Sequence, residues 1–191
     1  MSGFTFDKTR AMKADEGGYI STSDVYVGVI TKMIWFSKES GSGGVELSLE
    51  TVDGEKCNYV QIYTKNRDGS ENFAKVKIDS LAGILGLPSI TAVKTGNIIE
   101  FPIVYGKRIA FALQREEYRK EDNSIGWKMN LLHFFYPDTL QTYKEKEYAS
   151  PPETSQKEIK DILIDLSGQN QKSAPASQPN NASIEDDDLP F

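Results

Sequence analysis

The sequence has little of the chemistry on which most enzymes and metal proteins depend. It contains one cysteine, Cys57, and one histidine, His133. A single cysteine excludes a disulfide within the chain and fits a cytoplasmic setting. A lone histidine, without a second histidine or cysteine at ligand spacing, argues against a zinc site. Since no phosphate-binding loop, dinucleotide-binding glycine pattern or HExxH motif is present either, we expect no enzyme activity, no cofactor and no metal.

Long apolar runs are also missing. No stretch approaches the ~20 apolar residues that a membrane span requires. The first residues, Met1–Lys8, lack the apolar core of a signal peptide. We therefore expect a protein of the cytoplasm that has no membrane partner.

The chain has fewer positive than negative side chains, and this acidic excess is unevenly distributed along it. The net charge is −6, and residues 149–191 hold 3 lysines or arginines against 8 aspartates or glutamates. Residues 1–148 hold 19 cationic and 20 acidic residues, so most of the net negative charge belongs to the C-terminal part. A near-neutral domain can still bind a phosphate backbone when its cations gather on one face.

The chain divides into three parts. Residues 1–148 carry the short apolar and β-branched runs of one folded domain. Residues 149–168 include a predicted amphipathic helix over Thr154–Leu166, in which Ser155 and Glu158 fit a capping box. Residues 169–191 begin with a polar stretch that has no aromatic residue up to Ser183. Such a stretch cannot offset the entropy of ordering, so we expect a disordered linker and acidic tail.

The first part is predicted to be mainly β. We expect strands over residues 19–36, 45–50, 57–64, 98–104, 108–114 and 127–136, and a polar loop over 116–125. A short helix is expected near 79–87, capped by Asp79. Three strands, one helix and then further strands are the order of an OB-fold, a five-stranded barrel with a helix between its third and fourth strands. A β-sandwich is the alternative, and the single central helix favours the barrel.

Aromatic and cationic residues recur together along these strands. Tyr59 and Tyr63 share one strand face with Gln61, whereas Val60 and Ile62 take the opposite, core-facing side. Exposed rings that stack on bases, combined with cations that follow phosphates, are what single-stranded nucleic acid requires. A partner or subunit interface could use the same tyrosines. The predicted stacking residues are Trp35, Tyr59, Tyr63, Phe73 and Trp127, of which Trp127 could equally close the core.

The predicted phosphate contacts are the cations that lie beside those rings. Each lysine or arginine taken alone is more often an ordinary solvated side chain, so the prediction depends on their clustering with aromatic residues. These cations are Lys32, Lys56, Lys65, Arg67, Lys75, Arg115, Arg119 and Lys128.

The last six residues carry the sharpest motif. Asp186-Asp187-Asp188-Leu189-Pro190-Phe191 resembles the acidic tip of bacterial single-stranded DNA-binding proteins, which typically ends Asp-Asp-Asp-Ile-Pro-Phe. It follows a low-complexity linker, as it does in that family. More diffusely, residues 15–140 resemble the single-stranded DNA-binding proteins of tailed bacteriophages, and the N-terminal pattern of the bacterial family is missing.

The resemblance implies a division of labour. The barrel would bind and protect single-stranded DNA independently of sequence, and the tip would recruit replication, recombination and repair proteins in the host cytoplasm. The competing hypothesis is an OB-like interaction module that binds no DNA and competes for the partners of the host protein. Self-association into a homo-oligomer stays open, and the tetramer usual in the bacterial proteins is not assumed.

Overall fold

The computed structural model describes residues 18–157 and 159–164. The acidic tip Asp186–Phe191 and the predicted linker therefore lie outside the described residues. None of the helices in the described part of the chain is long and apolar enough to cross a membrane.

The described chain is mainly β, as predicted. Its sheet comprises β1 (Asp24–Ser37), β2 (Gly43–Thr51), β3 (Lys56–Lys65), β4 (Val93–Thr95), β5 (Ile98–Glu100), β6 (Arg108–Arg119), β7 (Ile125–Phe135) and β8 (Ile162–Ile164). The helical segments are α2 (Lys75–Ile84), the 3-10 turn η1 (Pro102–Val104), α3 (Tyr143–Glu147) and α4 (Glu153–Gln156).

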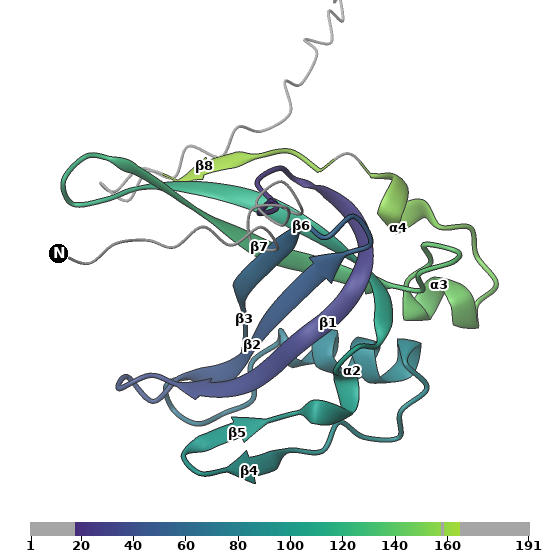
Figure 1. The fold of residues 1–191 in the computed structure, drawn as a ribbon, viewed down its shortest axis with the longest axis horizontal. Helices are drawn as coiled ribbons and strands as arrows, with labels where there is room; N and C mark the ends of the chain where they lie inside the picture. Colours follow the sequence, from purple (N-terminus) through teal and green to yellow (C-terminus); the bar gives the residue numbers. More distant parts are fainter. Residues whose placement is uncertain (1–17, 158, 165–191) are drawn as a thin grey trace, which may run out of the picture.

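Strand β1 organises the sheet. Its second half pairs with β2 and its first half pairs with β6, and a bulge between Ile30 and Lys32 lets the strand bend between its two partners. β3 extends the sheet beyond β2, and β7 extends it beyond β6. The long, curved β1 is visible in Figure 1. No ladder joins β3 to β7 within residues 18–157 and 159–164, so this sheet is open at that point.

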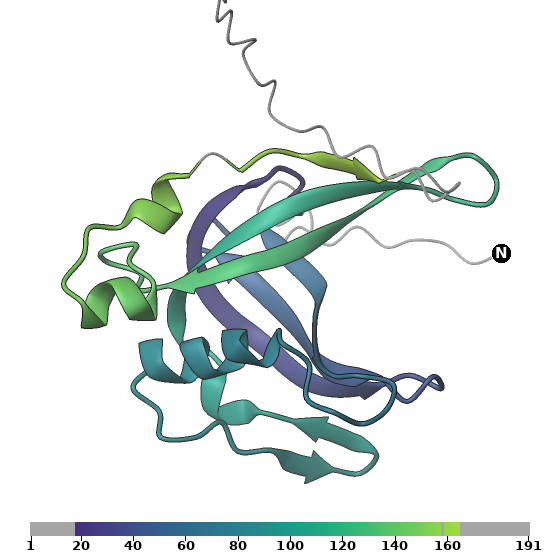
Figure 2. The same ribbon diagram turned by 180° about the vertical axis from the view of Figure 1, so that it is seen from behind.

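The main core lies inside the curve of the sheet. Alternate residues of β2 and β3, among them Leu47 and Val60, are fully buried there, and α2 covers this side with Leu81 and Ile84 (Figure 2). Strand β6 is buried on both faces, because Phe111 belongs to the main core and Ala110 to a second, small cluster. This double burial explains why residues 109–113 are apolar without alternation.

Several predicted boundaries were wrong. Helix α2 begins at Lys75, so Asp79 lies inside it and binds the Lys75 ammonium at 3.1 Å instead of capping it. The predicted strand over 98–104 ends at Glu100, since Pro102 begins the 3-10 turn. Strands β6 and β7 extend into the predicted 116–125 loop, so that residues 120–124 alone form the hairpin turn.

The predicted helix over Thr154–Leu166 was also wrong. Only Glu153–Gln156 is helical, and Ile162–Ile164 instead forms β8, which pairs in parallel with β6 from Glu116 to Tyr118. The Glu145 carboxylate accepts hydrogen bonds from the backbone N–H and the hydroxyl of Thr154, and Ile159 packs on the small cluster around Phe135. Tertiary contacts thus outweigh a helical periodicity that spans about three turns.

Candidate nucleic-acid interface

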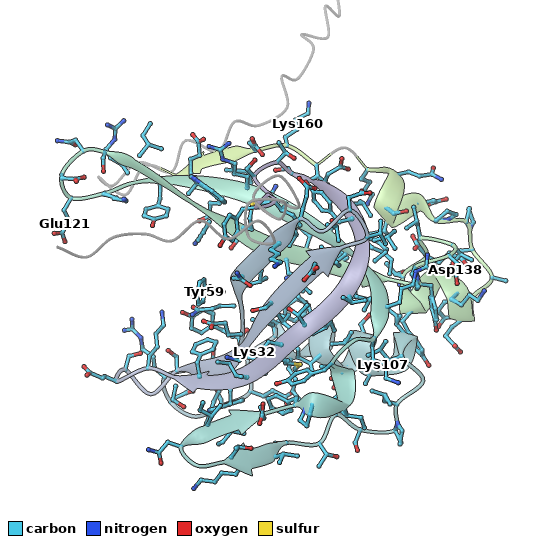
Figure 3. All side chains as sticks on the ribbon, viewed as in Figure 1. Lys32, Tyr59, Lys107, Glu121, Asp138 and Lys160 are labelled. Atoms are coloured by element: carbon cyan, nitrogen blue, oxygen red, sulfur yellow. The ribbon has the colours of Figure 1, made fainter. Side chains whose placement is uncertain are left out.

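Two hairpins reach out on the same side of the molecule. In Figure 1 the β1–β2 tip and the β6–β7 tip both point to the left, with the ends of β2 and β3 between them. Figure 3 places Tyr59 in the space between the hairpins and Glu121 at the tip of the β6–β7 hairpin. The surface between the two tips contains much of the predicted binding face.

The outer face of β1, β2 and β3 carries a fixed pair of rings. Phe36, Gly44 and Tyr63 stand side by side in register, and the Phe36 and Tyr63 rings meet edge to face with centroids 5.1 Å apart. A Cβ atom on Gly44 would come within 2.0 Å of the Ile62 carbonyl oxygen, so only glycine fits between them. The Lys38 ammonium lies 5.0 Å from the centre of the Tyr63 ring.

A polar row follows on the same face. The Tyr63 hydroxyl donates to Gln61 Oε1 at 3.2 Å, and Gln61 Nε2 donates to a Glu46 carboxylate oxygen at 3.0 Å. Val60 and Ile62 point to the opposite side and are buried, as the alternation of the sequence predicts. Lys32 is exposed on the neighbouring strand β1.

The gap between β3 and β7 forms a cleft of about 480 Å³. This β3–β7 cleft is lined by Tyr19, Ile20, Lys56, Cys57, Asn58, Tyr59, Trp127, Lys128 and Met129. It brings together two predicted stacking residues, Tyr59 and Trp127, and two predicted cations, Lys56 and Lys128. The two aromatic residues are exposed, Tyr59 at 77% and Trp127 at 44%. Cys57 lies at the floor, where burial raises the pKa of its thiol to about 11.

Ion pairs hold the β7 side of this cleft in place. The Arg115 guanidinium lies 5.4 Å from the centre of the Trp127 ring and pairs with Glu117 at 2.6 Å. Lys128 pairs with Glu116 at 2.8 Å. The predicted cations Arg115 and Lys128 are therefore oriented by carboxylates on β6, whereas Lys56 forms no ion pair within the described residues.

Trp35 lies on the other side of the sheet from Phe36. It packs against the main core and donates from Nε1 to the Ser37 hydroxyl at 2.9 Å. It lines a second cleft of about 370 Å³, bounded by β1, the end of β3, α2 and the segment before β6. This β1–α2 cleft also contains Lys65 and Lys75, and Lys75 pairs with Asp79 and with Glu71.

The remaining predicted residues lie around the rims. Phe73 is the most exposed of them, at 86%, in the loop between β3 and α2. Arg67 lies in the same loop, and its carbonyl oxygen approaches Gly41 of the β1–β2 turn. Arg119 ends β6 beside the turn of the β6–β7 hairpin. The predicted set is thus divided between the two clefts and the face that joins them.

Tyr19 was missed by the sequence reasoning. Its backbone neighbours bind the start of β3, with Ile20 N–H donating to the Lys56 carbonyl and Lys56 N–H to the Gly18 carbonyl, both at 2.9 Å. Tyr19 is 69% exposed and lines the β3–β7 cleft. No local pattern could have revealed it, because its position depends on pairing with a strand more than thirty residues away.

No group of three histidine, cysteine, aspartate or glutamate side chains that could hold a metal ion occurs in the described part of the chain. Neither a scan against protein-family models nor a search of curated proteins finds a match to this sequence. The functional interpretation therefore depends on the geometry of the interface and on the motif at the C-terminus.

Proposed function

We propose that this chain is a non-enzymatic, sequence-independent single-stranded DNA-binding protein with an OB-fold. The observation that carries the proposal is the band of aromatic residues between the two hairpins, from the half-buried Tyr63 through the exposed Tyr59 to the exposed Trp127, with Lys32, Lys38 and Lys56 beside it. Each stacked base contributes about 1–3 kcal/mol whatever its identity. Lysines add phosphate attraction without reading sequence.

The order of the strands supports the OB-fold. β1 pairs with both β2 and β6, and α2 follows the third strand, as in that barrel. β6 and β7 take the places of its fourth and fifth strands, and β4 and β5 form an inserted hairpin. OB-folds bind oligonucleotides on the face of strands two and three, between the loops that join strands one to two and four to five. The corresponding loops here are the two hairpin tips.

The C-terminal motif supplies the second half of the proposal. A terminal Phe191 with its carboxylate, preceded by three aspartates, suits an apolar pocket with a basic rim. The linker raises the concentration of the tip around any partner of the bound strand. The protein would protect exposed strands in the cytoplasm of a phage-infected host and recruit replication, recombination and repair proteins to them.

A fluorescence titration tests the DNA half. Adding oligo-dT to the full chain is expected to quench tryptophan emission, and the affinity is expected to fall steeply between 50 and 200 mM salt. A duplex of the same length serves as the control and is expected to bind more weakly, because its bases are not free to stack. If 50 mM salt gives neither quenching nor a gel shift with oligo-dT, the DNA proposal fails.

Deletion of residues 183–191 tests the tail half. Strand binding is expected to persist or strengthen, because the deletion removes four carboxylate side chains that repel phosphates. Capture of replication and repair proteins is expected to disappear. Loss of strand binding would contradict the division of labour. Capture of partners by a chain that binds no DNA would favour the interaction-module hypothesis.

A further inference from the structure

The gap in the sheet between β3 and β7 has the components of a pocket for a single base. Aromatic residues from three separate elements line it: Tyr19 before β1, Tyr59 on β3 and Trp127 on β7. None of these three rings stacks on another ring within the described residues, and only the Trp127 ring has a cation over it there. The cleft volume of about 480 Å³ lies within the range of small-ligand sites.

A bulge in β3 turns Tyr59 toward this gap. The register between β2 and β3 shifts between Leu47 and Leu49, and Tyr59 has a φ of 63°, which is rare for an aromatic residue. As a result Asn58 and Tyr59 are both exposed, although they are consecutive in a strand. Bulges of this kind commonly re-aim a side chain next to a functional site.

Among the described residues, Arg115 is the one ring partner of Trp127. The Arg115 guanidinium lies over its ring, yet Arg115 is not one of the residues that line the cleft. Trp127 itself lines the cleft, so the part of the indole that Arg115 does not cover can meet a base there. Lys56 and Lys128 also line the cleft. Lys128 pairs with Glu116, whereas Lys56 forms no ion pair with a described residue and can meet a phosphate beside an inserted base.

We infer that the β3–β7 cleft captures one nucleobase of the bound strand, held between Trp127 and the ring of Tyr19, with Tyr59 at its edge. The inference rests on the proposed function and adds the segment around Tyr19 to the DNA site. The ligand of the cleft is then a nucleobase and not a phosphate or a peptide side chain. The backbone hydrogen bonds of Gly18 and Ile20 to Lys56 position Tyr19 at the cleft.

The test compares two strands and three variants of the full chain. Tyr19→Ala is expected to weaken binding of oligo-dT about tenfold, the affinity that a single lost stacking contact carries. The same variant is expected to bind an abasic oligomer of equal length as tightly as the unaltered protein does. Tyr19→Phe keeps the ring and is expected to keep the affinity for oligo-dT.

Tyr148→Ala is the matched control, because this tyrosine is 74% exposed and follows α3, on the opposite side of the molecule from the hairpin tips (Figure 1). It is expected to change neither affinity. Thermal unfolding of each variant checks that folding is intact. A Tyr19→Ala variant that folds and binds oligo-dT with unchanged affinity would overturn the base pocket and leave the proposed function standing.

Three other outcomes are equally informative. If Tyr19→Ala loses the same factor on the abasic oligomer, or if Tyr19→Phe behaves as the alanine variant does, the residue does not stack on a base and the inference is wrong. If the unaltered protein binds neither strand, the proposed function fails and the inference with it.

Discussion

The β3–β7 cleft and the β1–α2 cleft contain similar residues but differ in how far their tryptophan is exposed. Each has one tryptophan and two of the predicted lysines. In the β3–β7 cleft Trp127 is 44% exposed and Lys56 forms no ion pair with any described residue. In the β1–α2 cleft Trp35 packs against the core, and Lys75 pairs with Asp79 at 3.1 Å.

The difference shows what makes an aromatic residue available to a ligand. Trp35 uses its ring to fill the space beneath β1 and its N–H to bind Ser37. Trp127 has only the Arg115 guanidinium as its ring partner among the described residues. We therefore propose that the β3–β7 cleft binds DNA and that Trp35 supports the core, although the sequence predicted stacking for both tryptophans and offered a core position only for Trp127.

The largest expected effect is on stability. Trp35→Ala is expected to lower the free energy of unfolding by about 2–4 kcal/mol, near the range for removal of a packed tryptophan, because the core loses its contacts below β1. The variant that remains folded is expected to bind oligo-dT within about twofold of the unaltered protein. Urea denaturation and a DNA titration measure the two quantities. Unchanged stability together with weakened binding would reverse the assignment of the clefts.

The second effect is on affinity. Trp127→Ala is expected to weaken oligo-dT binding by about 1–3 kcal/mol through lost stacking, with unfolding changed by no more than about 0.5 kcal/mol, as at exposed positions. Trp127→Phe retains a stacking surface and removes the fluorophore. Emission from the remaining Trp35 should then respond little to DNA. Quenching that survives undiminished in Trp127→Phe would place the DNA near Trp35.

Much of the fold could be predicted from local patterns. Alternation in residues 45–50 and 57–64 gave the strands, and it correctly assigned Val60 and Ile62 to the core. Alternation cannot reveal a bulge, so the left-handed conformation of Tyr59 was not foreseen. Alternation also cannot predict which of Trp35 and Phe36 faces the core, because that depends on the bulge after Ile30.

Two of the missed features share a physical cause, because each depends on a distant partner, whereas the start of α2 is a local exception. Ile162–Ile164 has helical spacing but becomes a strand because the edge of β6 offers a ladder. Asp79 has the chemistry of a helix cap, but α2 starts four residues earlier, after Asn72 has accepted a bond from the Ala74 N–H at 2.9 Å. Tyr19 enters the site only through its neighbours' bonds to Lys56.

A smaller effect is expected on the salt dependence of the affinity, and it should differ between Lys56 and Lys75. Lys56→Ala is expected to reduce the slope of log affinity against log salt by about 0.7, the value of one phosphate contact on a single strand. Lys75→Ala is expected to leave that slope unchanged, because Asp79 and Glu71 already neutralise its charge. Titrations at four salt concentrations give the slopes. A lower slope in Lys75→Ala would show that the strand reaches the β1–α2 cleft.

The smallest effect uses Cys57 as a reporter on the floor of the β3–β7 cleft. Only the thiolate is alkylated, and burial raises the pKa of this thiol to about 11. Alkylation of the folded chain should therefore be slow at pH 8 and accelerate toward pH 11, whereas the urea-unfolded chain should titrate near the ordinary cysteine value of about 8.5.

Bound oligo-dT is expected to slow the alkylation of Cys57 in the folded chain further, and an abasic oligomer of the same length is expected to slow it less. Equal rates with and without oligo-dT at saturation would mean that the strand passes over the cleft without entering it. The DNA site would then be confined to the outer face around Phe36 and Tyr63.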